Sequence, residues 1–155
     1  MPVSVYLRKG RLAVTLLATV LVTSSCGMAL HYMKNGFVKA PPASEFGLGP
    51  RTSAGTTFTA SVRTVKPLTV GPLQAVRLEL LDAEGKPVND AQIRIDGGMP
   101  QHGHGLPTKP RITSTEPNGV YVVEGVRFNM GGWWELKFAV SANASKDSVT
   151  FNIRL

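Results

Sequence analysis

The feature that most constrains the fold is a series of short segments, spread over residues 56–155, in which apolar and polar residues alternate. In 73–82, for example, Val76, Leu78 and Leu80 fall on one face and charged residues lie between them. Similar segments lie at 56–65, 91–96, 111–116, 120–128, 133–140 and 148–155. Turn residues separate them, and none shows a sustained helical period. The pattern predicts an all-β antiparallel β-sandwich of about seven strands.

Glycine and proline are frequent, with 16 and 11 residues, which fits many turns between short strands. One glycine interrupts the alternation of "VYVVEGVRF" (120–128), so we expect a β-bulge or bend there. In "WWELKFAV" (133–140), Trp134, Leu136, Phe138 and Val140 fall on one face, but which face holds Trp133 and Trp134 stays open.

The amino terminus carries a separate signal. Basic residues precede an apolar run from Leu12 to Val22, and small residues follow as far as Cys26. This is the form of a secretory signal peptide. The run also extends to about Tyr32, so an uncleaved anchor helix of about 20 residues fits equally. Residues 1–33 are therefore predicted to be a hydrophobic signal or anchor helix, and the remainder to be exported.

Cys26 is the only cysteine, so the exported part cannot form an internal disulfide. The sequence "VTSSC" resembles a bacterial lipobox, although Thr23 stands where an aliphatic residue is usual. Lipidation of Cys26, a plain membrane anchor and complete cleavage are three open alternatives. Residues 34–55, rich in Pro, Gly, Ser and Ala, are expected to be a flexible linker to a domain at 56–155.

Charge and motifs exclude several functions. The formal net charge is +7, but the basic residues form no block with interleaved aromatics, so we expect no nucleic-acid binding. No serine is marked as a nucleophile, and no phosphate loop or dinucleotide fingerprint is present. The chain is therefore not expected to be an enzyme.

One loop, "DGGMPQHGHGLPT" at 96–108, contains Met99, His102 and His104. Residues two apart in an extended segment point the same way, so both imidazoles can face one point. Thioether and imidazole ligands together suit copper, as Cu(I) or Cu(II). Asp96 either orients one histidine or begins a turn ahead of the glycines. The competing interpretation is that the histidines are solvated and the methionine is an apolar plug.

A second glycine turn, "NMGG", contains Met130 and follows a strand two strands later. Alternate connections of a sandwich cluster at the same end, so Met130 could complete the set of ligands. Trp133 or Trp134 could cap such a site.

Residues from about 76 to 155 resemble the YtkA-like and FixH-like family of exported domains. The resemblance is carried, in order, by "GKPV", an "MP" near histidines and glycines, and "MGGWWEL". It implies an immunoglobulin-like sandwich at the outer face of a bacterial cytoplasmic membrane. FixH-like members are linked to copper delivery for respiratory oxidase assembly, which supports Met99, His102, His104 and Met130 as copper ligands.

The leading hypothesis is an exported, membrane-tethered β-sandwich of the bacterial cell envelope. It would bind a copper ion through Met99, His102, His104 and Met130 and act as a metal carrier or chaperone. The alternative is a metal-free structural or interaction module of the envelope, in which glycine-rich loops and exposed aromatics contact a protein partner.

Overall fold

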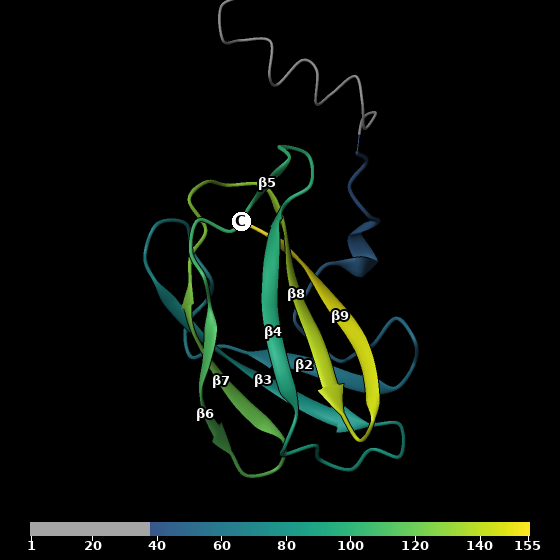
Figure 1. Ribbon diagram of the computed structural model, residues 1–155. Helices are drawn as coiled ribbons and strands as arrows, with labels where there is room; N and C mark the ends of the chain where they lie inside the picture. Colours follow the sequence, from purple (N-terminus) through teal and green to yellow (C-terminus); the bar gives the residue numbers. More distant parts are fainter. Residues whose placement is uncertain (1–37) are drawn as a thin grey trace, which may run out of the picture. The chain divides into compact units, whose positions relative to one another are not determined.

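The computed structural model describes residues 38–155. The predicted signal or anchor segment at 1–33, with Cys26, lies outside the described residues. Residues 38–155 form an all-β sandwich of two antiparallel sheets, as the alternation predicted. In Figure 1, β4, β8 and β9 run across β2 and β3, which belong to the other layer.

The first sheet has five strands in the order β1-β2-β3-β7-β6. Their bounds are Arg51–Thr52 (β1), Phe58–Arg63 (β2), Gln74–Asp82 (β3), Val120–Val126 (β7) and Arg111–Glu116 (β6). The second sheet has four strands in the order β5-β4-β8-β9. Their bounds are His104–Gly105 (β5), Gln92–Met99 (β4), Trp133–Ala142 (β8) and Ser145–Arg154 (β9). One short 3-10 helix, η1, spans Ala43–Glu45.

The core lies between the sheets and follows the predicted alternation. Val76, Leu78 and Leu80 of β3 are buried against apolar residues of β8 and β9. The buried residues of those two strands include Trp134, Leu136, Phe138, Val140, Val149, Phe151 and Ile153. Because the side-chain period of a strand is two, each strand places its apolar set on the inner face.

Each of the seven predicted segments overlaps one strand, although β4, β8 and β9 extend beyond the predicted bounds, and the predicted bulge is confirmed. Gln74 pairs with Val126 and Val76 with Val123, so β7 holds one residue more than β3 between these pairs. Gly125, one of the two intervening residues of β7, has φ +84°. A left-handed backbone of this kind favours glycine.

Two short strands were not predicted. β5 lies within the segment 96–108 that was expected to be a loop, and β1 lies within the expected linker. Phe46 bridges to Asn152 of β9, and the N–H of Val62 donates to the carbonyl of Leu48. Residues of the stretch 38–55 therefore contact the sandwich, although their composition resembles that of a linker.

Asp147 of β9 fixes the turn between β1 and β2. Its carboxylate accepts a hydrogen bond from the hydroxyl of Ser53 at 2.5 Å and others from the N–H groups of Gly55, Thr57 and Ser148. Burial raises the pKa of Asp147, but these hydrogen bonds to the charged form outweigh it and hold the pKa well below its usual value. The contact joins the two sheets through one charged side chain.

Contacts group Asn35–Leu155 into one compact unit. Because this unit contains a complete apolar core, we expect it to fold without the first 34 residues. Among residues 38–155, no helix is long and apolar enough to cross a membrane.

Candidate metal site

The site is built on the hairpin of β4 and β5. β4 continues to Met99, and β5 begins at His104, so only 100–103 remain as a turn. The N–H groups of His102 and Gly103 both donate to the carbonyl of Met99, at 3.0 Å each. The segment predicted as a loop is thus mostly strand, and Asp96 lies inside β4 rather than at the start of a turn.

Glycine explains why the strand continues. A Cβ on Gly97 would lie 2.2 Å from the carbonyl oxygen of Glu135 on β8, which no real side chain allows. Without side chains, β4 approaches β8 closely enough for Gly97 to pair with Leu136. Composition suggested a loop because glycine is rare in regular strands, but here it permits the close backbone approach.

The hairpin brings three of the predicted residues together. Met99 and His104 are direct cross-strand partners, so their side chains lie on the same face. The ring centroids of His102 and His104 are 5.8 Å apart, and both side chains are exposed. An imidazole binds a first-row metal at about 2.0–2.1 Å, so two rings on one ion have centroids about 4.5–6.5 Å apart. The observed separation falls within that range.

The ring of His104 is oriented by a neighbouring carbonyl. Its Nδ1 lies 3.3 Å from the carbonyl oxygen of Gly105. A carbonyl can only accept, so Nδ1 is the donor in this hydrogen bond, and Nε2 is the ring nitrogen left available to a metal. Metal-binding histidines are usually held in this way, with the second ring nitrogen donating to a carbonyl or carboxylate.

Asp96, one candidate for that orienting role, does not contact a histidine. Its Oδ1 accepts a hydrogen bond from the N–H of Gly97 at 2.8 Å. Since residues alternate between the faces of a strand, Asp96 and Met99 point to opposite faces of β4. The carbonyl of Gly105 therefore orients the histidine, which is the role that the sequence suggested for Asp96.

Met99 is 1% exposed and belongs to the core. A Cβ on Gly132 would lie 2.7 Å from the Met99 Cε, and Gly132 has φ +126°. The glycine of the "NMGG" turn therefore leaves the space that the methionine fills. Met99 is an apolar plug, as the competing interpretation expected, and at the same time the cross-strand neighbour of His104.

Trp134 connects the hairpin to the turn that carries Met130. The centroid of its ring lies 5.9 Å from that of His104, edge to face. Its Nε1 donates to the carbonyl oxygen of Met130 at 3.0 Å. The side chain of Met130 is 38% exposed. The β7–β8 turn thus meets the hairpin at one end of the sandwich, and a buried tryptophan lies beneath the histidines.

Both tryptophans are buried, on opposite faces of β8. Trp134 faces the core, and Trp133 donates from Nε1 to Oδ1 of Asn152 at 2.9 Å. The exposed aromatics expected for an interaction module are therefore not provided by Trp133 or Trp134.

The chemistry of the available donors restricts the metal. Within residues 38–155, no three His, Cys, Asp or Glu side chains come together as metal ligands. Beside the two imidazoles, the hairpin also carries the thioether of Met99, the cross-strand partner of His104. That combination suits copper better than zinc, magnesium or calcium.

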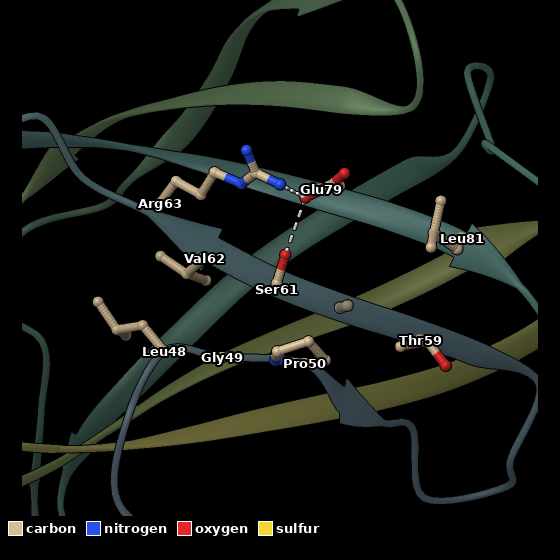
Figure 2. Close-up of a pocket in the computed structure, with 10 residues that line it drawn as sticks. Leu48, Gly49, Pro50, Thr59, Ser61, Val62, Arg63, Glu79 and Leu81 are labelled. Carbon is tan, nitrogen blue, oxygen red and sulfur yellow. Dashed lines mark hydrogen bonds and ion pairs between the residues drawn. The ribbon is translucent and has the colours of Figure 1, made fainter. Parts of the chain in front are cut away.

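Other hollows lack this chemistry. One of about 450 Å³ lies beside β1 and β2 and is lined by Leu48, Pro50, Val62 and Leu81, among others. Figure 2 shows its carboxylate, Glu79, already bound by Arg63 at 2.7 Å and by the hydroxyl of Ser61 at 3.1 Å. The charges of this hollow are paired with one another, so we assign it no ligand.

Comparisons with known proteins add a family. The family model described as YtkA-like matches residues 52–139. No curated protein matches the chain. Two solved structures are similar. The filamin domain of Lin-41 has 16% identity and a TM-score of 0.39, over 61% of this chain and 91% of that one. The ZirS C-terminal domain has 19% identity and a TM-score of 0.37, over 77% and 84%. Scores this low carry no argument about function.

Proposed function

The chain belongs to the YtkA-like family, and from this premise we propose that its sandwich, of the immunoglobulin-like type, binds one copper ion at the β4–β5 hairpin. His102 and the Nε2 of His104 supply two nitrogen ligands. Met99 supplies a thioether from the core side, and Met130 supplies a second from the β7–β8 turn. The observation that carries the proposal is the histidine pair, with His104 oriented by Gly105, directly beside a methionine.

The arrangement supports a carrier rather than a catalyst. Both histidines are exposed, so a second protein can reach the ion and exchange ligands with it. Sulfur ligands favour Cu(I), and the thioether stays neutral, so the ion can leave without a proton having to return to the sulfur. No step of this transfer needs a nucleophile or a general base from the protein.

In the cell, this carrier is proposed to be exported and held at the bacterial envelope, through lipid on Cys26 or through an uncleaved anchor within residues 1–33. Its acceptor would be an envelope protein. Assembly of a respiratory oxidase is the role suggested by the resemblance to FixH-like proteins, and it stays a hypothesis.

The test is a competition titration of residues 35–155 with Cu(I) and Cu(II) against chelators of known affinity. We expect one ion per chain, and we expect H102A/H104A to lose tight binding, because two of the four ligands are removed. D96N is the matched control, since Asp96 and Met99 point to opposite faces of β4 and the Asp96 carboxylate accepts a hydrogen bond from the N–H of Gly97 rather than from a histidine. Equal affinity in H102A/H104A and the unaltered domain would refute the site.

A further inference from the structure

The exposed apolar side chains of the described residues gather on two adjoining loops. Four large apolar side chains are exposed in this part of the chain: Val65 (84%), Leu73 (66%), Val70 (43%) and Met130 (38%). The first three lie in the β2–β3 loop and the fourth in the β7–β8 turn. We call this set the apolar rim.

The two loops are joined by direct contacts. Val70 bridges to Phe128, and the N–H of Gly71 donates to the carbonyl of Phe128 at 2.8 Å. The ring of Phe128 packs on that of Trp134, with centroids 5.2 Å apart. The two loops that carry the apolar rim therefore lie side by side, and Val65 and Leu73 line one hollow of the β2–β3 loop.

Positive charge accompanies the apolar rim. Lys66 stands beside Val65, and Arg127 lies in the other loop, both exposed. Neither forms an ion pair within residues 38–155. The segment 64–73 contains no acidic residue.

A hollow of about 660 Å³ opens behind the β2–β3 loop. Its lining is mostly apolar, with Leu68, Leu73 and Val122 among its residues. Of its two cationic residues, Arg77 is ion-paired with Glu116, whereas Lys66 forms no ion pair within residues 38–155. An apolar space with Lys66 at its wall fits an acyl chain that carries an anionic headgroup.

We propose that the apolar rim docks on the surface of an anionic phospholipid membrane, with Val65 and Leu73 entering the interface and Lys66 and Arg127 facing lipid phosphates. The combination of aliphatic tips and basic neighbours is the one that binds such surfaces. It is a poor match to a protein interface, because lysine is depleted there and Val and Leu are under-represented among the residues that dominate binding energy.

Co-sedimentation of metal-free residues 35–155 with vesicles tests the proposal. This range omits the apolar run, which would bind lipid by itself. We expect binding to vesicles of equal parts phosphatidylglycerol and phosphatidylcholine, weakening as salt rises, and little binding to pure phosphatidylcholine. The double variant V65S/L73S should bind on the order of tenfold more weakly or worse.

K66E should also weaken binding on the order of tenfold, since it replaces an attraction by a repulsion. K86E is the matched control, because Lys86 is equally exposed but lies in the β3–β4 connection, and it should bind as the unaltered domain does. All substituted side chains are exposed, so the variants should fold, which circular dichroism would verify.

No binding to phosphatidylglycerol vesicles, or undiminished binding in V65S/L73S, would overturn the proposal and leave the apolar rim to a protein partner. Neither result bears on the proposed copper site, because the vesicle assay contains no metal.

Discussion

Substitution of Met99 separates its two roles, as core residue and as copper ligand. The side chain is 1% exposed and packs against Gly132. M99A removes most of a buried side chain and leaves a cavity, which typically costs about 2–5 kcal/mol of unfolding free energy. M99L keeps nearly the same apolar volume and should cost less than about 1.5 kcal/mol. Leucine has no sulfur, however, so both variants remove the proposed thioether ligand.

The assay is urea unfolding of metal-free residues 35–155, followed by Cu(I) competition on the same preparations. With an m-value of about 1–3 kcal/mol/M in urea, a loss of about 3 kcal/mol lowers the urea midpoint by about 1–3 M. We therefore expect M99A to unfold far more easily and M99L to unfold almost as the unaltered domain does. M99L should nevertheless bind Cu(I) at least about tenfold more weakly, equivalent to about 1.4 kcal/mol.

Two results would refute this reasoning. Unchanged Cu(I) affinity in M99L would show that Met99 is only an apolar plug. Unchanged stability in M99A would show that the side chain does not occupy the core position beside Gly132.

Three further predictions concern stability. G132A should lose about 1–3 kcal/mol in urea titrations, because the new Cβ meets Met99 and the backbone is left-handed; full stability would contradict the packing. D147N should lose about 1–3 kcal/mol at pH 7, because the charged acceptor for Ser53 is gone. Because the pKa of Asp147 is lower in the folded state, its charge stabilises the fold above about pH 4, and this contribution is lost as pH falls through the folded-state pKa. The difference in unfolding free energy between D147N and the unaltered domain should therefore shrink on acidification. A difference that stays constant would argue against the hydrogen-bonded, charged carboxylate. Y121F should cost about 1–2 kcal/mol by calorimetry, because its hydroxyl bonds two backbone groups of the β3–β4 connection, and an unchanged melting temperature would count against those bonds.

Local alternation was sufficient to predict the long strands. Val76, Leu78 and Leu80 face the core because a shift of register by one residue would bury Arg77 and Glu79 instead. This alternation can be read from the segment alone. The bulge at Gly125 was predictable for the same reason, since the break in alternation is local.

The hairpin was not predictable in this way. Gly97 is in a strand only because it faces Leu136 of β8, a partner far away in the sequence. His104 is in a strand only because it pairs with Met99. Composition near these residues favours a loop, and the pairing that overrides it depends on the tertiary fold.

The candidate site residues stay a prediction, and one premise behind them is wrong: His102 lies in the 100–103 turn and only His104 in a strand, so the two are not in one extended segment. The rings do lie close, with centroids 5.8 Å apart, but a turn through Gly103 brings them together rather than the extended spacing that the sequence suggested. The carbonyl of Gly105 and the indole of Trp134 were less visible, because a backbone acceptor leaves no mark in the sequence and either tryptophan could have faced inward.

X-ray absorption spectroscopy of Cu(I)-loaded residues 35–155 tests the central claim most directly, because it reports the atoms bound to the metal. The account predicts nitrogen from two imidazoles and sulfur from at least one thioether, with the imidazole signal absent in H102A/H104A. A spectrum with only oxygen and nitrogen neighbours, or one that the double variant leaves unchanged, would contradict it.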